Sequence, residues 1–271
     1  MSDTVKWNAI GNLPEIYEHI FVPAVMNVWA HKVVNQLSPR QGHRILDMAC
    51  GTGAVTIEFA HRLGKESRIV GYDISPEMLE VARRKWSFTG IDWQLGDVSQ
   101  LPFQDGSFDI VTCHFALMFF PDRVGALKEM YRVLAPGGQL LALVWGAIER
   151  NPGFHAVAEG FGHHFSADAR EGIRGSFVLG DREKVRALAA AAGFTDAHVY
   201  ELNAQAYFPS VESLVHGYGA LLQAAIDWAT YTRLMDSVTA DLRSYVTSGV
   251  LIHPIEAIAM SVTKHVVDMN V

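Results

Sequence analysis

The stretch that decides the fold is Asp47-Met48-Ala49-Cys50-Gly51-Thr52-Gly53-Ala54. An apolar run at 44–49 predicts a buried strand before the turn, and an amphipathic segment at 54–63 predicts a helix after it. The two glycines allow the backbone to turn tightly and let a ligand approach without a Cβ in the way. They also suit a plain strand-to-helix turn, so the neighbouring segments have to decide between the two interpretations.

Short apolar runs and helical segments alternate on both sides of this turn. This alternation predicts an α/β fold with a doubly wound, mostly parallel sheet of seven strands. The expected strands are 44–49, 68–72, 92–95, 108–113, 139–145, 197–208 and 257–266. The expected helices are 54–63, a helix capped by Ser75 that runs to about Lys85, and then 122–134, 181–192 and 211–248.

The flanking segments predict a helical cap on this sheet. Residues 13–37 carry apolar side chains at helical spacing, and Pro23 is expected to divide them into two helices because it lacks an N–H. Residues 151–180 contain six glycines and are interpreted as an insertion. We therefore expect a single domain over residues 1–271. Its core is placed at 42–150, 181–208 and 255–267, and its cap at 1–41, 151–180 and 209–253.

Acidic residues accompany three successive strands. Asp47 precedes the glycine turn, Asp73 ends the second strand 20 residues after Gly53, and Asp97 follows the third. A carboxylate at the second position can accept hydrogen bonds from both hydroxyls of a ribose. One at the third position can reach the amino group of an adenine. The three together indicate a nucleoside site.

A dinucleotide-binding enzyme is the main alternative for such a site. Its fingerprint needs a third glycine at position 56, where this chain has Thr56, and Asp47 is unfavourable next to a diphosphate. A ligand that carries an ammonium and a sulfonium suits these residues better. A nicotinamide-dependent oxidoreductase stays open as the less favoured alternative.

Five ordered motifs resemble those of class I S-adenosylmethionine-dependent methyltransferases. The similar branch includes ubiquinone- and menaquinone-biosynthesis and natural-product methyltransferases. The motifs are Arg44–Ala54, Gly71–Leu79, Gly96–Phe103, Ser107–Val111 and Tyr131–Leu140. The resemblance is strong over about residues 43–145 and weaker over 181–208 and at Tyr17-Glu18. It implies a Rossmann-like fold, an S-adenosyl-L-methionine cofactor, and direct SN2 transfer of a methyl group to an O, N, S or C acceptor.

The resemblance also implies roles for individual residues. Asp73 would hold the ribose, and Tyr17 would close over the cofactor. The methionine and ribose side would be lined by Asp47, Ala49, Cys50, Gly51 and Gly53. The adenine would pack on Ile74 and Met78, and Asp97 and Val98 would recognise its edge.

His114 follows the fourth strand and would stand near the reacting sulfur. It is the candidate catalytic residue, because an imidazole titrates near neutral pH and can act as a general base. Packing beside the cofactor without a role in proton transfer is the alternative. The second functional hypothesis is a catalytically silent protein that binds the cofactor as a sensor or scaffold.

Apolar residues after the fourth strand suggest the nature of the acceptor. Phe115, Met118, Phe119 and Phe120 are interpreted either as core or as the floor of a substrate pocket, with the helices of 211–248 as its roof. The expected acceptor is a small, partly apolar or aromatic metabolite.

Composition narrows the partners and the location. The net charge of −7 argues against nucleic acid and anionic membranes as partners. Cys50 and Cys113 fit no zinc motif, and His163-His164 has no accompanying carboxylate, so no metal is expected. Without a secretion signal or an apolar run of about 20 residues, a cytoplasmic protein is expected. A homodimer is compatible with the sequence.

Overall fold

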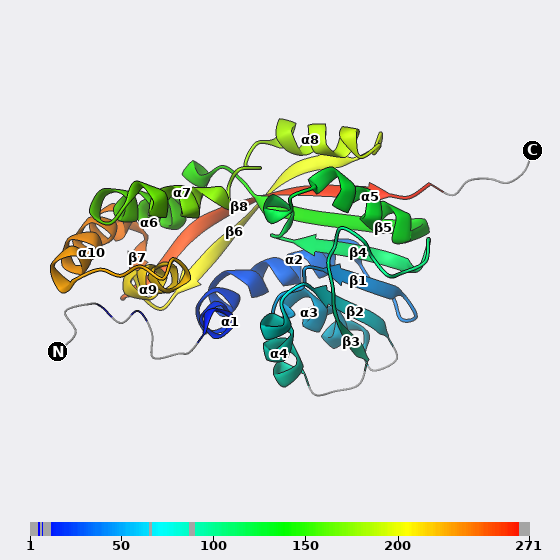
Figure 1. Ribbon diagram of the computed structural model, residues 1–271, viewed down its shortest axis with the longest axis horizontal. Helices are drawn as coiled ribbons and strands as arrows, with labels where there is room; N and C mark the ends of the chain where they lie inside the picture. The colour runs from blue at the N-terminus through cyan, green and yellow to red at the C-terminus, as the bar shows by residue number, and fades with distance from the viewer. Residues whose placement is uncertain (1–4, 6, 8–11, 65–66, 87–89, 266–271) are drawn as a thin grey trace, which may run out of the picture. The chain divides into compact units, whose positions relative to one another are not determined.

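The chain forms two compact units in a computed structural model that describes residues 5, 7, 12–64, 67–86 and 90–265 (Figure 1). The core unit comprises Trp29–Val144, Leu179–Leu202 and Ala257–Val271. The helical unit comprises Met1–Val28, Trp145–Val178 and Asn203–Glu256. The predicted single domain, with its core and cap, stays a prediction.

A sheet with the strand order β3-β2-β1-β4-β5-β8-β6 organises the chain. Its strands are β1 (Arg44–Met48), β2 (Arg68–Asp73), β3 (Ile91–Leu95), β4 (Phe108–His114), β5 (Leu134–Trp145), β6 (His198–Phe208) and β8 (Val250–Thr263). The pairs from β3 to β5 are all parallel. The short β7 (Val246–Thr247) pairs antiparallel with β8 outside this path. The described residues thus confirm the α/β fold and the path of seven strands, and they add β7.

The order of the strands reverses next to β1. The chain moves outward from β1 through β2 to β3 and then returns to β4 on the other side of β1. In open α/β sheets, ligands bind beyond the carboxyl ends of the strands at such a reversal. The carboxyl ends of β1 and β4 therefore mark the place where a site is expected.

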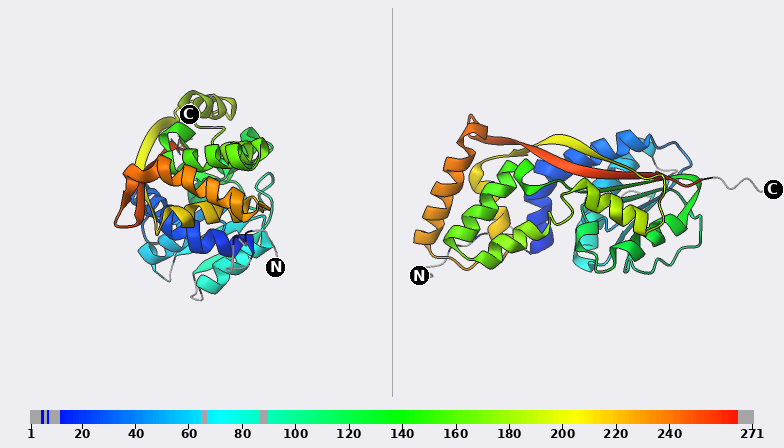
Figure 2. Two further views of the ribbon diagram at one scale, coloured as in Figure 1. Left: turned by 90° about the vertical axis from the view of Figure 1, so that its left-hand side faces the viewer. Right: turned by 90° about the horizontal axis from the view of Figure 1, so that it is seen from above.

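The helices of the core unit form where their caps predict. The α3 helix (Ala54–Leu63) ends at Gly64, whose φ of 74° a glycine adopts without strain. In α4 (Pro76–Lys85), the Ser75 side chain accepts a hydrogen bond from the Met78 N–H. The other helices are α2 (Asn27–Leu37), α5 (Arg123–Val133) and α8 (Arg182–Ala191). In Figure 2, α2 lies on one side of the sheet, and α5 and α8 lie on the other.

The predicted break at Pro23 is wrong. The chain continues without interruption from α1 (Leu13–Ile16) through η1 (Tyr17–Met26) into α2. The η1 segment is a π-helix, and the Asn27 N–H at its end donates to the carbonyl of Val22, five residues back. In an α-helix, the ring of a proline clashes with the carbonyl of the residue four positions before it. In a π-helix the turn is wider, and the bonded carbonyl is the one five positions before.

The segment 151–180, which is interpreted from the sequence as an insertion, consists of regular helices. This segment forms α6 (Pro152–His164) and α7 (Ala167–Gly175) in the helical unit, beside α9 (Val211–Leu221) and α10 (Trp228–Leu242). A Cβ at Gly160 would come within 2.7 Å of Val238 on α10. That glycine is a point of close helix contact rather than the sign of a loop. The last strand also begins seven residues earlier than expected, and its predicted end, Val266, lies outside the described residues.

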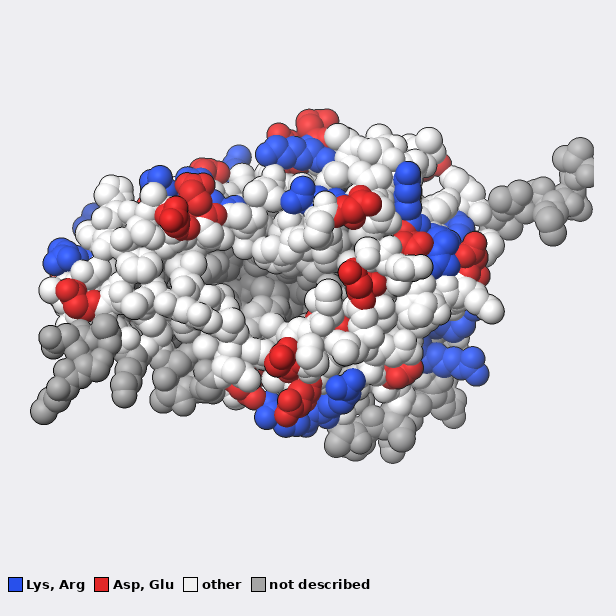
Figure 3. Space-filling view, in the orientation of Figure 1, with Lys and Arg blue, Asp and Glu red and all other residues white. Residues whose placement is uncertain are grey.

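The surface of the described residues mixes both signs of charge. Lysine, arginine, aspartate and glutamate alternate over the face in Figure 3, without a large patch of one sign. Among the described residues, no helix is both long and apolar enough to cross a membrane.

Candidate functional site

The turn after β1 has three residues with left-handed backbone. They are Ala49 (φ 53°), Gly51 (φ 55°) and Gly53 (φ 85°). A Cβ at Gly53 would lie 2.4 Å from the ring of Trp93, so this glycine is needed for packing against β3. A Cβ at Gly51 would meet no atom within 4 Å. The two glycines therefore act differently, and Gly51 borders open space that a ligand can enter.

Asp73 connects this turn to the end of β2. Its carboxylate accepts hydrogen bonds from the Gly51 N–H at 2.7 Å and from the Ser75 N–H at 2.9 Å. The residue is 7% exposed. An ionised carboxylate has about four acceptor positions, so two remain for further donors. The arrangement suits a diol whose two hydroxyls approach the carboxylate together.

Backbone hydrogen bonds join the carboxyl ends of β1, β2 and β3. The Cys50 N–H donates to the Tyr72 carbonyl at 3.1 Å, and the Gly96 N–H donates to the Asp73 carbonyl at 2.9 Å. The turns after β1, β2 and β3 are thus held in one row. Asp47, Asp73 and Asp97 come from these three neighbouring strands and turns, as the sequence predicts.

Asp47 supports the turn from within. It is 1% exposed, and its oxygens accept hydrogen bonds from the hydroxyls of Thr56 at 2.6 Å and Thr112 at 2.9 Å. Burial raises the pKa of Asp47 to about 6, although both hydroxyls lower it. In the sequence, Thr56 stands out only as a missing glycine, and Thr112 was not singled out. The available signal for Thr112 was a hydroxyl within the apolar run 110–113.

Apolar side chains are exposed beside the row of turns. Ile74 is 66% exposed after β2, and Leu95, which the sequence analysis missed, is 58% exposed at the end of β3. Met78 and Val98 are half-buried. Exposed apolar residues next to ordered polar groups suit a flat heterocycle such as adenine. Asp97 accepts a hydrogen bond from the Ser99 N–H at 2.8 Å, which lowers its pKa and keeps the exposed carboxylate charged.

His114 ends β4, next to β1. The residue is half-buried, and its Nε2 is buried and has no hydrogen-bond partner among the described residues. Burial lowers the pKa of His114 to about 3, so the imidazole is neutral at pH 7 and only weakly basic. Phe115 follows with left-handed backbone (φ 52°), and the centroids of the two rings lie 4.6 Å apart. An unpaired buried nitrogen is unfavourable, which makes Nε2 a place for a donor from a ligand.

The predicted site residues divide between the two units. Tyr17 lies in η1 of the helical unit, where its ring stacks on Phe21 at 6.3 Å, so its closure over a cofactor stays a prediction. All the others belong to the core unit, at the carboxyl ends of β1 to β4 or in the turns and the first turn of α4 after them. Burial raises the pKa of Cys50, so its thiol stays protonated. Among the described residues, no three histidine, cysteine, aspartate or glutamate side chains are grouped to hold a metal ion.

Solved structures share the fold of this chain. A candidate methyltransferase from Bacillus halodurans C-125 is 22% identical, with a TM-score of 0.58 over 88% of this chain and 99% of that chain. Phosphoethanolamine N-methyltransferase 2 of Haemonchus contortus, solved with phosphomonomethylethanolamine and S-adenosylhomocysteine, is 20% identical. Its TM-score is 0.56 over 88% of this chain and 53% of that chain. At these identities the likeness shows the fold alone.

Sequence relatives identify the family. Demethylmenaquinone methyltransferase of Staphylococcus aureus (strain MRSA252) is 38% identical over 139 residues, which are 51% of this chain and 55% of that protein. The chain thus spans about half the length of the curated relatives it matches. The sequence model of the ubiE/COQ5 methyltransferase family matches residues 15–166, more than half of the chain. The resemblance in the five motifs is therefore confirmed, and the chain belongs to the ubiE/COQ5 methyltransferase family.

Proposed function

We propose that this protein is an S-adenosylmethionine-dependent methyltransferase that acts on a small, partly apolar metabolite. The observation that carries the proposal is the Asp73 carboxylate, which is fixed by two backbone N–H groups beside the open space at Gly51. Family membership supports the same cofactor. The ribose hydroxyls would donate to Asp73, and the adenine would pack on Ile74 and Met78 with its amino edge toward Asp97 and Val98.

The methionine end of the cofactor would lie along the turn after β1. Ala49, Cys50 and Gly51 present backbone there, and Gly53 allows the turn to close on Trp93. Asp47 would add negative charge beneath this turn, which favours a cationic ligand. Its hydrogen bonds to Thr56 and Thr112 fix the position of that charge.

The bound cofactor supplies a methyl group on a sulfonium, which is already a strong electrophile. The contribution of the protein is to hold the acceptor in line behind that methyl group and to exclude water, which is worth roughly 7–11 kcal/mol. His114 would accept a hydrogen bond at Nε2 from an acceptor O–H or N–H and so orient its lone pair. When the acceptor loses its proton, water would take it, because the lowered pKa of His114 makes Nε2 a weak base. Oxygen, nitrogen, sulfur and carbon acceptors all fit this scheme.

The acceptor would be partly apolar. The Staphylococcus aureus relative is named for demethylmenaquinone, an apolar aromatic compound. After His114, Phe115 and Met118 are buried and Phe119 is 63% exposed, which supports an apolar floor on the core unit. The predicted roof, in 211–248, belongs to the helical unit, most of which lies beyond the matched residues 15–166. For this reason the proposal names a chemical class and not one compound.

We also infer a cytoplasmic protein with a small-molecule acceptor and without a nucleic-acid partner. The net charge of −7 and the mixed charges on the face in Figure 3 support the absence of a nucleic-acid partner. A homodimer stays a prediction that light scattering decides. Cell fractionation tests the location.

The experiment is incubation of the purified protein with methyl-labelled S-adenosylmethionine and a metabolite extract, followed by mass spectrometry of labelled products. The expected result is one labelled small molecule and the release of S-adenosylhomocysteine. Tight cofactor binding in calorimetry without any labelled product would favour the silent binding protein instead. Absence of cofactor binding would refute the proposal.

A further inference from the structure

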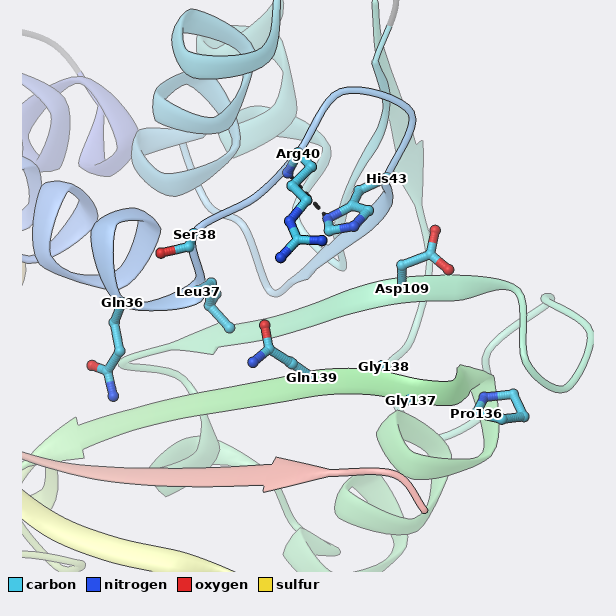
Figure 4. A pocket seen from close by; sticks show the side chains of 10 residues that line it. All are labelled: Gln36, Leu37, Ser38, Arg40, His43, Asp109, Pro136, Gly137, Gly138 and Gln139. Atoms are coloured by element: carbon cyan, nitrogen blue, oxygen red, sulfur yellow. Dashed lines mark hydrogen bonds between the residues drawn. The ribbon is translucent and has the colours of Figure 1, made fainter. Parts of the chain in front are cut away.

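A second pocket lies in the core unit, at the amino ends of β1, β4 and β5 (Figure 4). The cofactor residues lie at the carboxyl ends of β1 and β4, so the two places are on opposite edges of the parallel sheet. The pocket has a volume of about 620 Å³. Pockets for metabolites usually measure about 300–1,000 Å³. Its lining comes from the end of α2, the loop 38–43, Asp109 and the start of β5.

The lining is polar, and its only carboxylate is neutralised. Asp109 accepts two hydrogen bonds from the Arg44 guanidinium, at 2.8 and 3.0 Å, and a third from the Arg44 N–H at 2.8 Å. This pairing lowers the pKa of Asp109 and keeps the ion pair intact at neutral pH. Apart from this pair, the charge at the pocket is that of Arg40, which is exposed. The pocket therefore carries a net positive charge.

Arg40 and His43 stand on a turn that holds itself in shape. The His43 N–H donates to the Arg40 carbonyl at 3.1 Å, and the Arg40 N–H donates to the Nδ1 of His43 at 3.2 Å. Because Nδ1 accepts, a neutral imidazole carries its proton on Nε2 and can donate from there. The two side chains are thus presented together by a closed loop.

Several donors in the pocket have no partner in the described part of the chain. This holds for the guanidinium of Arg40 and for the side-chain amides of Gln36 and Gln139, for which the structure records no hydrogen bond. In Figure 4 the Arg40 side chain extends from the loop toward β4, and Gln139 extends from β5 toward the same space. A guanidinium binds carboxylate and phosphate groups through two parallel hydrogen bonds.

We propose that this pocket binds a small organic anion through its carboxylate or phosphate group, with Arg40 and the Nε2 of His43 as the charged and polar anchors. Gln36 and Gln139 would hydrogen-bond the polar remainder of the ligand. The ligand is larger than a simple inorganic ion, because the volume exceeds what one ion fills. The inference does not depend on the methyltransferase proposal, because binding is measured without cofactor or acceptor.

The test is titration calorimetry of the full chain with inorganic phosphate and, separately, citrate, at constant ionic strength maintained with sodium chloride. We expect saturable binding of at least one of the two, and the stronger probe tells phosphate from carboxylate chemistry. Arg40→Gln is expected to weaken binding at least tenfold. Gln139→Glu, which adds a negative charge at an exposed position, should weaken it as well. The control is Arg243→Gln, which removes the same charge at an exposed position of the helical unit.

Two results would overturn the inference. One is no saturable binding of either anion by the wild type at 20 mM, a concentration about twenty-fold above the 1 mM Kd that corresponds to weak binding. The other is equal binding by Arg40→Gln, Gln139→Glu and Arg243→Gln, which would show a general effect of charge. Amide shifts in an NMR titration provide a second readout, and they should cluster at residues 36–43 and 136–139.

Discussion

Replacement of Asp73 by asparagine tests the cofactor site most directly. The two side chains have nearly the same volume, but asparagine lacks the charge and has one acceptor oxygen instead of two. In the wild type, the Gly51 and Ser75 N–H groups each bond one of the two oxygens. In the variant, one of these N–H groups faces an NH₂ and loses its partner. An unsatisfied donor costs about 1–3 kcal/mol, so the protein should be less stable but still folded.

The effect on cofactor binding should be larger. Two ribose hydroxyls would donate to the charged carboxylate, and a hydrogen bond to a charged group is worth about 1.5–3 kcal/mol. Because a second partner can be partly replaced by water, we expect a total loss of about 2–4 kcal/mol. This corresponds to a Kd for S-adenosylmethionine that is about 30- to 1,000-fold weaker. Asp73→Ala should weaken binding at least as much.

Titration calorimetry measures this change, and circular dichroism with thermal unfolding verifies the fold. Asp92→Asn is the matched control, because Asp92 is an exposed carboxylate within β3 and away from the turns. It should bind the cofactor like the wild type. A folded Asp73→Asn protein with unchanged Kd would refute the assignment of the ribose to this strand end. Equal weakening in both variants would show only a general effect of charge.

Four further predictions follow from the structure and the motifs. Burial raises the pKa of Asp47 from its ordinary 3.8 to about 6 in the folded state. Its charge therefore destabilises the folded state by about 3 kcal/mol above about pH 6, and this cost disappears below pH 3.8. The stability of the wild type relative to Asp47→Asn, measured by urea unfolding from pH 4 to 7, should fall as pH rises, whereas a constant difference would contradict the assigned pKa. Gly51→Ala should destabilise the protein by only about 1–2 kcal/mol, because the left-handed backbone disfavours alanine but the space for its Cβ is open. It should nevertheless weaken cofactor binding at least tenfold. An unchanged Kd would mean that the cofactor does not use this space. Transfer activity should survive dialysis against EDTA, and a loss that a divalent ion restores would show a metal requirement. Finally, if the segment 1–41 closes over the cofactor, hydrogen exchange in residues 8–22 should slow on cofactor binding, and deletion of 1–22 should reduce transfer more than folding. Equal exchange with and without cofactor would refute this lid hypothesis. Residues 8–11 lie outside the described part of the chain.

Local signals predicted the core unit well. The cap of α4 at Ser75 and the end of α3 at Gly64 involve residues within a few positions of one another, so the sequence alone contains the relevant contacts. The strands β1, β2 and β4 contain short apolar runs, and the ends of β1 to β4 were predicted within one residue. The grouping of Asp47, Asp73 and Asp97 followed from these strand ends, because neighbouring parallel strands end at the same edge of a sheet.

The remainder depended on partners far away in the sequence. The six glycines in 151–180 gave no sign of its helices, because Gly160 lies against Val238, which is 78 positions away. Pro23 is accommodated by a π-helix, for which the sequence contains no established signal. In the site, Thr112 donates to Asp47 across 65 positions, so its role could be recognised only after β1 and β4 were paired. Tertiary contact decided the cases of Gly160 and Thr112, and local helix geometry decided that of Pro23.

Strain at two residues indicates why the site lies where the strand order reverses. Ala49 and Phe115 are not glycines, yet both have left-handed backbone, which costs of order 1 kcal/mol or more each. Each begins the turn after one of the two adjacent strands β1 and β4. Phe115 is held by its N–H bond to the Leu143 carbonyl at 2.9 Å, and Ala49 is followed by Cys50, which bonds Tyr72 at 3.1 Å. The neighbouring strands β5 and β2 thus stabilise both strained turns, and the sheet itself keeps the backbone at Gly51 and the ring of His114 in place before any ligand binds.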